Sequence, residues 1–334
     1  MTLLLSEADV ENLLDLNDSI EAVESGFLHH GLGRAQSKPR REVRIRGKEL
    51  PHADPRMVRI AQGLAFSDQL GVGILHHILS FPDGNPPSFR VINYLISGQN
   101  GDTLAIVNSR KLLGMRTGAA GAVSAKYLSR RTSKVAGVIG TGQQGRMQLR
   151  FLLKVRPIER AYIYDKIKIY KEKYAEEMSK ELGIDVISQE NVEQVVDKSD
   201  ILVTATPSMD PYVKADWIHQ GILINIIGAD DPPKIELEGS ALKKADKLII
   251  MSEECFDAGQ LRIPMEQGVL KKDDVYGTLG EIIAGLKPAR ERDDEIIIYH
   301  NPGMTLQDLV IVHRAYQKAM KLGIGKEVND PFRQ

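Results

Sequence analysis

The stretch VAGVIGTGQQG at residues 135–145 decides how this chain folds, because an apolar run leads directly into three spaced glycines. The glycines are Gly140, Gly142 and Gly145, in the pattern G-x-G-x-x-G, and the following residues, QQGRMQLRFLLKV, have the apolar spacing of a helix. The next apolar run, AYIYD, ends at Asp165. A strand, a glycine turn and a helix in this order give a tight turn, a bare backbone and an open helix N-terminus.

This arrangement predicts a dinucleotide site. A bare backbone lets a pyrophosphate approach closely, and the helix N-terminus offers unpaired N–H groups to the phosphates. A carboxylate at Asp165 would accept hydrogen bonds from ribose hydroxyls and repel a 2′-phosphate, so NAD is favoured over NADP, although Lys166 and Lys168 soften that preference. The residues of the loop expected to contact the cofactor are Gly140, Thr141, Gly142, Gln143, Gln144, Gly145 and Asp165.

A later apolar segment, ILVTATPS (201–208), predicts another strand of the same sheet and the turn after it. Thr204, Thr206 and Ser208 would then lie at the carboxyl edge, where sheets of this class bind ligands. Threonine also favours strands for its own reasons, so each residue has a purely structural explanation as well.

Working outward, the sequence predicts an α/β fold in which a Rossmann-type parallel sheet domain is inserted in a smaller α+β outer domain. From about residue 134 apolar strands alternate with helices, which is typical of a parallel sheet covered on both faces. Before it, residues 6–33 predict a helix, whereas 38–50, 71–81 and 90–96 predict strands of a mixed or antiparallel sheet, with a hairpin turn at NGDT. The expected boundaries are 1–118 for the first part of the outer domain, 119–302 for the NAD-binding domain and 303–334 for a C-terminal helix that returns to the outer domain.

Composition narrows the class of protein. The 334 residues include 44 basic and 45 acidic side chains, which argues against nucleic-acid or membrane-surface binding. One cysteine excludes an internal disulfide and a cysteine-based zinc cluster, and no metal ligands are expected. The start has no basic n-region and no apolar run is long enough to span a bilayer, so a cytoplasmic protein is expected.

The chain resembles the ornithine cyclodeaminase and mu-crystallin family, which includes archaeal-type alanine dehydrogenases and ketimine reductases. Residues from nearly the whole chain carry the resemblance: KPRREVRI (38–45), FPDGNPP (81–87), LLGMRTGAAGAVSAKYLSR (112–130), VIGTGQQGRMQ (138–148), DILVTATPS (200–208), INIIGADDPPKIEL (224–237), TLGEIIAGLKPAR (278–290) and NPGMTLQDL (301–309). It implies an NAD-dependent enzyme of amino-acid metabolism whose smaller α+β outer domain binds the substrate and forms the homodimer.

The resemblance also implies roles for single residues. Arg116, in R-T-G-A-A, and Arg41 would grip a substrate carboxylate, because guanidinium offers a planar fork to it. Arg40 and Arg44 compete for the role of Arg41 but would lie on the opposite face of the strand. Asp230, in G-A-D, matches the catalytic acid or base of the cyclodeaminases. Thr117 and Gly228, in the same two segments, are further expected cofactor contacts, and Asp308 matches an acidic residue at the start of the last helix, which a helix dipole would also favour.

Two departures from the family pattern concern the substrate side. The family's usual lysine on the strand before F-P is replaced here by His76 or, in another alignment, by Gly73. His76 would serve as a cation or proton donor, or would be an ordinary packed strand histidine. Arg59, in MVRIAQG, would add an anion contact or simply be exposed.

Three functions follow from these features. The first is an NAD(H)-dependent oxidoreductase that interconverts an L-amino acid and its imine or 2-oxo acid by hydride transfer at the α-carbon. The second is ornithine cyclodeamination, in which NAD is recycled within the site and ammonia is released. The third is a mu-crystallin-like protein that binds a dinucleotide and a ligand without turnover, which the retained Asp230 and Arg116 weigh against.

Overall fold

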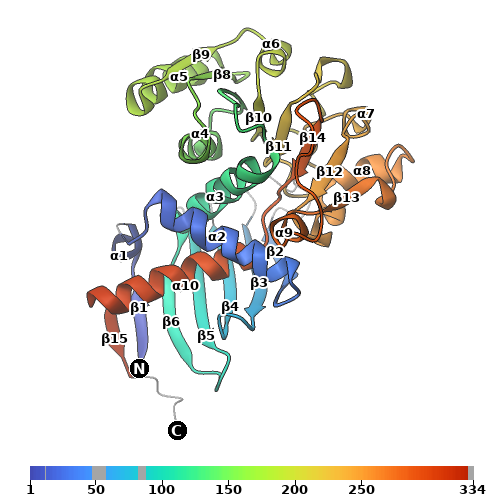
Figure 1. Cartoon of the computed structure of the whole chain (residues 1–334). Coiled ribbons are helices and arrows are strands. Elements are labelled where there is room, and N and C mark those ends of the chain that lie inside the picture. The colour runs from blue at the N-terminus through green and yellow to red at the C-terminus, as the bar shows by residue number, and fades with distance from the viewer. Residues whose placement is uncertain (12, 47–57, 82–87, 330–334) are drawn as a thin grey trace. The chain divides into compact units, whose positions relative to one another are not determined.

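The computed structural model describes the chain except for residues 12, 47–57, 82–87 and 330–334, and it does not describe the side chains of residues 44–46 and 88. The chain divides into two compact units. The first is formed by Met1–Arg116 together with Met304–Gln334, and the second by Thr117–Gly303. Each unit has a sheet of its own (Figure 1).

The first unit has a seven-stranded sheet in the order β15-β1-β6-β5-β4-β3-β2. Neighbouring strands are antiparallel except for the parallel pair β1–β6. Its elements are β1 (Thr2–Leu5), α1 (Glu7–Glu11), α2 (Leu16–Gly31), β2 (Ala35–Arg46), β3 (Val58–Ser67), β4 (Val72–Phe81), β5 (Ser88–Ser97), β6 (Thr103–Asn108), the first turns of α3 (Arg110–Leu128), α10 (Thr305–Leu322) and β15 (Lys326–Val328).

One face of this sheet is covered by helices, and within the described residues no helix packs on the other, which is here called the open face. Helix α10 packs against α2 and against β2 to β5, and Figure 1 shows α2 and α10 lying over the same side of the strands. On β4 the residues facing the helices, Val72, Ile74, His76 and Ile78, are buried, as the period-two pattern of a half-covered strand requires. The position of α10 brings its buried first turn against β2, β3 and β4.

The second unit has an eight-stranded sheet in which every pair is parallel, in the order β13-β12-β14-β11-β10-β7-β8-β9. Its strands are β7 (Val135–Ile139), β8 (Arg160–Tyr164), β9 (Asp185–Ser188), β10 (Ile201–Thr204), β11 (Leu223–Ile226), β12 (Lys247–Ile250), β13 (Val275–Thr278) and β14 (Ile297–His300). Its helices, beside the rest of α3, are α4 (Gln143–Val155), α5 (Lys168–Leu182), α6 (Val192–Asp197), α7 (Gly239–Leu242), α8 (Gly259–Glu266), α9 (Leu279–Ile283) and three short 3₁₀ turns, η1 (Ala215–Trp217), η2 (Glu253–Asp257) and η3 (Lys272–Asp274).

The strand order of the second unit places its ligand-binding edge. From β7 the chain proceeds to β8 and β9 in one direction, and then returns to β10 and β11 on the other side of β7. The order therefore reverses between β7 and β10, and ligands bind at the carboxyl ends of strands at such a point. The predicted α/β fold class, with a parallel sheet and a second, mixed sheet, is confirmed.

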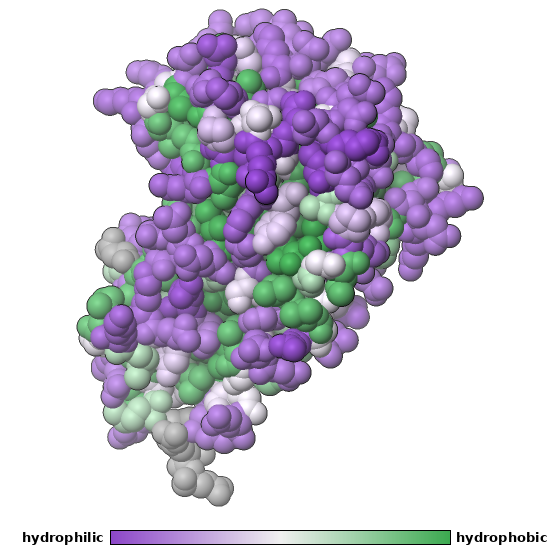
Figure 2. Space-filling model, viewed as in Figure 1, coloured by the Kyte–Doolittle hydropathy of each residue, from purple (hydrophilic) through white to green (hydrophobic). Residues whose placement is uncertain are grey.

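The surface of the second unit differs in character from its interior. Every residue of β10, β11, β12 and β14 is buried. Figure 2 shows that the surface over α5 and α6, at the top of the view, is mostly hydrophilic, as expected of helices that cover a buried parallel sheet. None of the described helices is long and apolar enough to cross a membrane. Within the described residues there is also no group of three or more His, Cys, Asp and Glu side chains that could hold a metal ion.

Some predicted elements need correction. The helix expected over 6–33 is two helices, because the Asp15 side chain accepts a hydrogen bond from the backbone N of Asp18 at 2.8 Å and so begins a new helix. The short strands β1, β13 and β15 were not predicted, since three or four residues carry too little periodicity. Strand β3 was not predicted as a strand either. The end of the strand predicted over 38–50 and most of the turn predicted at PDGNPP lie outside the described residues.

Candidate active site

The glycine loop of the second unit has the shape that a dinucleotide requires. Gly140 has φ +98°, and a Cβ there would meet the carbonyl oxygen of Ala205 at 2.4 Å. A Cβ on Gly145 would lie 2.1 Å from the carbonyl oxygen of Gly140. At Gly142, by contrast, a Cβ would meet nothing within 4 Å among the described residues. Two glycines are thus needed for the turn and the helix packing, and the third leaves open backbone.

The start of α4 offers donors, and Asp165 lies beside them. The N-cap residue, Gly142, makes no side-chain cap, so the helix N-terminus keeps backbone donors for an anion. Asp165 is half-buried and accepts hydrogen bonds from Thr141, from the backbone N at 3.1 Å and from Oγ1 at 2.9 Å. In the first turn Gln143 is exposed, while Oε1 of Gln144 is buried with no hydrogen-bond partner among the described residues. The donor set and the open backbone fit a dinucleotide.

The carboxyl ends of β10 and β11 are tied together by a buried glutamate, Glu236. Its carboxylate accepts hydrogen bonds from Oγ1 of Thr204 at 2.8 Å, from N and Oγ1 of Thr206 at 2.7 and 2.8 Å, and from N of Gly228 at 2.9 Å. Tyr212 also donates its hydroxyl to it, at 2.7 Å. Burial raises the pKa of Glu236, and the hydrogen bonds from Tyr212, Thr206 and Thr204 oppose that shift.

Gly228 and Ser208 lie at this edge, and Thr117 contacts α4. Gly228 has no room for a side chain, since a Cβ would meet the backbone of Thr206 at 2.2 Å. Ser208 forms a turn with Asp210, donating from Oγ to its carbonyl oxygen at 2.7 Å. Thr117, in α3, is buried, and its carbonyl oxygen accepts a hydrogen bond from Nε2 of Gln148 at 2.8 Å.

Asp230 follows β11 and is partly exposed. Lys234, four residues later, donates from Nζ to its Oδ1 at 2.5 Å. The residue before it, Ala229, is held by His300 at the end of β14, whose Nε2 lies 3.0 Å from the Ala229 carbonyl oxygen. Burial lowers the pKa of His300 to about 4, so the ring is neutral at pH 7 and donates through Nε2. The backbone of the turn that carries Asp230 is therefore held by His300, whereas the Asp230 side chain is partly exposed.

In the first unit, Arg116 and Asp308 form a buried ion pair. Arg116 Nε donates to Asp308 Oδ1 at 3.2 Å, and Arg116 NH1 donates to Gln307 Oε1 at 2.9 Å. Asp308, in the first turn of α10, also accepts a hydrogen bond from NH2 of Arg40 on β2 at 3.3 Å. Burial favours the neutral acid, but the charges of Arg116 and Arg40 outweigh it and hold the pKa of Asp308 below its usual value.

His76 completes this group. Its Nε2 lies 3.9 Å from Asp308 Oδ2 and has no hydrogen-bond partner among the described residues. Burial lowers the pKa of His76, as do the nearby Arg40 and Arg116, while Asp308 and a hydrogen bond to Asn93 act in the opposite direction. We call Arg40, His76, Arg116, Gln307 and Asp308 the Arg116 cluster. Two guanidinium groups and one carboxylate leave it with a net positive charge, which suits an anion.

The comparisons with known proteins agree with this geometry. Residues 1–322 match the model of the ornithine cyclodeaminase/mu-crystallin family. The chain belongs to this family. It is 35% identical to the alanine dehydrogenase of Archaeoglobus fulgidus, with 98% of each chain covered.

Solved structures of related proteins have the same fold. The chain is similar to a Δ¹-pyrroline-2-carboxylate reductase of Thermococcus litoralis in complex with NADH and L-proline, with a TM-score of 0.89, 34% identity and coverage of 98% of this chain and 100% of that one. It is also similar to an archaeal alanine dehydrogenase dimer with bound NAD, with a TM-score of 0.88, 34% identity and coverage of 98% and 99%. The predictions of the family and of an NAD-dependent enzyme are confirmed by these relatives.

Within this family member, two of the predicted substrate arginines lie outside the Arg116 cluster. Arg41 is exposed and Arg59 donates to Glu42 Oε2 at 3.4 Å, whereas the neighbouring Arg40 reaches Asp308. The register of β2 on β3 shifts between Lys38 and Arg41, so a bulge at this point turns the side chains. The side chain of the other competitor, Arg44, is outside the described residues.

Of the two alternatives for the family's lysine, His76 points into the cluster, and Gly73 lies elsewhere on β4. A Cβ on Gly73 would come within 3.1 Å of the Phe66 ring. Sequence reasoning did not select four residues that the structure connects to the candidate sites: Asn93, Ser109, Glu236 and His300. Glu236 lies in the motif that already drew attention to Asp230, and its apolar surroundings at 235–237 were the signal that it is buried.

Proposed function

We propose that this enzyme interconverts an L-amino acid, or a cyclic imino acid, and the corresponding imine or 2-oxo acid, using NAD(H). The observation that carries the proposal is the buried, net positive Arg116 cluster with its bare histidine nitrogen. A 2-amino or 2-imino carboxylate has the two groups that this cluster lacks, an anion for the guanidinium groups and an N–H donor for His76. Relatives named for alanine and for Δ¹-pyrroline-2-carboxylate support this substrate class.

The arginines would bind and orient the carboxylate. Arg116 is held from two sides by Asp308 and Gln307, so its guanidinium is fixed before a ligand arrives and little freedom is lost on binding. Arg40 shares Asp308 with it and is the natural second contact. We therefore favour Arg40 over Arg41 for that role. Arg59 remains a weaker candidate because Glu42 already accepts a hydrogen bond from it.

The glycine loop would hold the cofactor. We assign the pyrophosphate to the backbone of 140–145 and the N-terminus of α4, and the adenosine ribose to Asp165. When bound, NAD(H) accepts or supplies a hydride at the nicotinamide ring. Because Thr204 and Thr206 donate their hydroxyls to Glu236, they would shape the carboxyl edge rather than bond to the cofactor through those hydroxyls.

Asp230 would handle protons on the substrate nitrogen. It accepts a hydrogen bond from Lys234 and lies on a turn that His300 fixes through Ala229, so its position is defined although its side chain is partly exposed. A carboxylate so placed can stabilise the iminium cation that hydride removal leaves at the substrate nitrogen, or accept a proton from that iminium.

The test is a substrate panel followed by two readouts, NADH absorbance and free ammonia. The panel contains 2-oxo acids with ammonia or methylamine, cyclic 2-imino acids, and in the reverse direction L-amino acids, proline and ornithine. We expect NADH to be consumed with at least one oxo or imino acid. Release of ammonia from ornithine without net change in NADH would establish a cyclodeaminase instead, and no turnover with any compound would refute both.

A substitution at Asp230 tests its role. Asp230→Asn keeps the size of the side chain but removes the base, so turnover should fall by about 10²- to 10⁴-fold while NADH still binds, as followed by fluorescence. Asp231→Asn is the matched control at the neighbouring carboxylate and should retain turnover. Full activity in the Asp230 variant would show that the proton goes elsewhere.

We further propose that the enzyme is a homodimer formed through the open face of the first sheet. This face carries Ile60, Leu64 and Phe66 of β3, exposed by 39, 44 and 40%, with Gln62 between the first two, and contact with water disfavours these three apolar side chains. One related structure is a dimer. Ile60→Glu with Leu64→Glu should halve the mass measured by light scattering, whereas Ile169→Glu, at an isoleucine on α5 that is 68% exposed, should leave it unchanged.

A further inference from the structure

The buried contacts of His76 define which of its nitrogens carries the proton. His76 on β4 lies directly opposite Asn93 on β5, and its Nδ1 is 2.8 Å from Asn93 Oδ1. The Asn93 amide nitrogen, Nδ2, donates to Ser109 Oγ, and that hydroxyl is within 3.4 Å of the carbonyl oxygen of Val91. A carbonyl only accepts, so the Ser109 proton points to Val91, the amide NH₂ points to Ser109, and the amide oxygen is left for His76. An acceptor at Nδ1 requires that Nδ1 carry the hydrogen.

The other nitrogen of His76 is consequently a bare acceptor. Nε2 lies 3.9 Å from Asp308 Oδ2, another acceptor, and no described residue donates to it. His76 is completely buried, so bulk water does not satisfy this lone pair. Two acceptors that face each other across this distance have room for a donor between them or beside them.

The charges around the ring keep it neutral in the free enzyme. The charged groups that face it are Asp308 from α10, Arg40 from β2 and Arg116 from α3, and Asn93 from β5 is its neutral partner. Burial and the two arginines lower the pKa of His76 more than Asp308 and Asn93 raise it. At pH 7 the ring therefore has a lone pair to offer and does not act as a ready cation.

We propose that Asn93 and Ser109 are positioning residues that hold His76 as its Nδ1–H tautomer, so that Nε2 accepts first a hydrogen bond and then a proton from the substrate nitrogen. This inference rests on the proposed function, because it requires a 2-amino or 2-imino carboxylate in the Arg116 cluster. In the proton transfer an N–H bond of the substrate ammonium breaks, an Nε2–H bond forms, and the resulting imidazolium is stabilised by Asp308. In the opposite direction the imidazolium returns the proton to the amine.

The tautomer is measured in the ligand-free enzyme. Long-range ¹H–¹⁵N correlation spectra of protein labelled at histidine separate protonated from bare ring nitrogens, and a His76→Gln variant identifies the His76 signals. We expect His76 to show a protonated Nδ1 and a bare Nε2. His300 is the control in the same spectrum, because its bond to Ala229 requires the opposite tautomer. A wild-type His76 that is protonated at Nε2 and bare at Nδ1 would overturn the proposal.

Substitution of Asn93 adds a functional readout. Asn93→Asp keeps an acceptor at Nδ1 and adds a negative charge, so the His76 titration and the matching limb of the pH profile of kcat/KM should both move to higher pH by about one unit or more. Asn93→Leu removes the acceptor, and the His76 signals should then show a mixture of tautomers or the reversed one. An unmoved pH profile in a folded Asn93→Asp enzyme would overturn the role in catalysis. The substrate panel is a separate readout, so loss of the proposed function is distinguishable from loss of this inference.

Discussion

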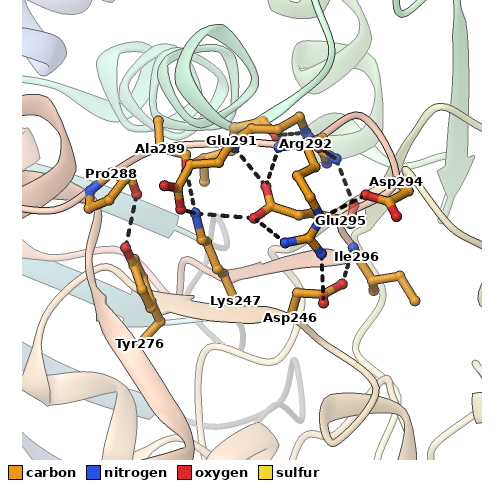
Figure 3. Close-up of polar contacts among 12 residues, drawn as sticks. Asp246, Lys247, Tyr276, Pro288, Ala289, Glu291, Arg292, Asp294, Glu295 and Ile296 are labelled. Carbon is orange, nitrogen blue, oxygen red and sulfur yellow. Dashed lines mark hydrogen bonds and ion pairs between the residues drawn. The ribbon is translucent and has the colours of Figure 1, made fainter.

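The Arg116 cluster of the first unit and a second group of buried charges in the other unit differ in how completely they are paired. In the second group, here called the Lys247 network, Lys247 Nζ donates to the carbonyl oxygen of Ala289 at 2.5 Å and to Glu291 at 2.7 Å, and lies 3.3 Å from Glu295 (Figure 3). Each of the three N–H donors of the Lys247 ammonium group thus has an acceptor. The Arg116 cluster instead keeps two buried nitrogens, His76 Nε2 and Arg40 Nε, without hydrogen-bond partners in the described part of the chain.

The difference separates a structural ion pair from a binding site. Lys247 is the first residue of β12, at the opposite edge of the sheet from the glycine loop, and Glu295 precedes β14. Burial lowers the pKa of Lys247, but its bonds to Glu291 and Glu295 outweigh that and raise it, so the lysine stays charged. In the Lys247 network each donor of the ammonium group has a protein acceptor, so none is left for a ligand. The network holds the loop before β14 in place. An incomplete one retains hydrogen-bonding capacity that only a ligand can use.

The largest effect is expected at Arg116. Arg116→Lys keeps the charge but loses the planar fork that bonds both Asp308 and Gln307. We expect kcat/KM to fall by about 10³-fold, which is roughly 4 kcal/mol of lost transition-state binding. The measurement is steady-state kinetics with the best substrate of the panel, and Arg41→Lys is the control at an exposed arginine. A loss smaller than tenfold at Arg116 would break the comparison, since the cluster would then be structural as well.

A similar substitution in the Lys247 network should affect stability and leave catalysis alone. Glu295 is 2% exposed and Lys247 is 6% exposed, so Glu295→Gln leaves a buried ammonium with only the exposed Glu291 as a charged partner. We expect the free energy of unfolding to fall by about 3 kcal/mol, with kcat/KM unchanged. The urea midpoint measures the first quantity and steady-state kinetics the second.

Removing both charges sharpens this test. The double variant Lys247→Met with Glu295→Leu should recover stability relative to Glu295→Gln, because no uncompensated charge remains buried. If the double variant were the less stable of the two, the hydrogen bonds that the backbone N–H groups of Glu291 and Arg292 donate to Glu295 would matter more than the ion pair.

The same comparison explains which parts of the molecule could be predicted from sequence. The glycine loop and Asp165 could be predicted because their function depends on spacing within a short segment, and the strand and helix around them are strongly apolar. Arg116 and Asp308 could each be named, but their bond joins residues 192 apart in sequence, which no local pattern indicates. For the same reason Asn93 and Ser109 were not expected beside His76, since only the register of the sheet brings them there.

The choice between Arg40 and Arg41 could not be made from the sequence, for a different reason. Alternation along a strand correctly separates Arg40 from Arg41, but it does not say which of the two faces the helix. The bulge between Lys38 and Arg41 and the position of α10 determine that, and both are tertiary features. Glu236 was not selected from the sequence because its five donors come from three separate segments, which only the tertiary fold brings together.

The smallest expected effect is on stability in acid, where two buried carboxylates should behave in opposite ways. The pKa of Asp308 is lowered in the folded state, so its contribution is present above the unfolded value of about 3.9 and is lost as the pH falls through the folded pKa. The pKa of Glu236 is raised, so the folded state binds its proton more tightly and acid favours folding through this residue.

Urea midpoints at pH 5 and pH 3 test this opposition. Wild-type protein should lose stability over that range, Asp308→Asn should lose less by about 1 kcal/mol, and Glu236→Gln should lose more. The many surface carboxylates contribute equally to the pH dependence of stability in both variants, so their contribution cancels in the comparison. If the acid-induced loss of stability changed in the same direction in both variants, the arginines around Asp308 would not stabilise its charge by more than burial costs. The Arg116 cluster would then have little net positive charge to offer a substrate.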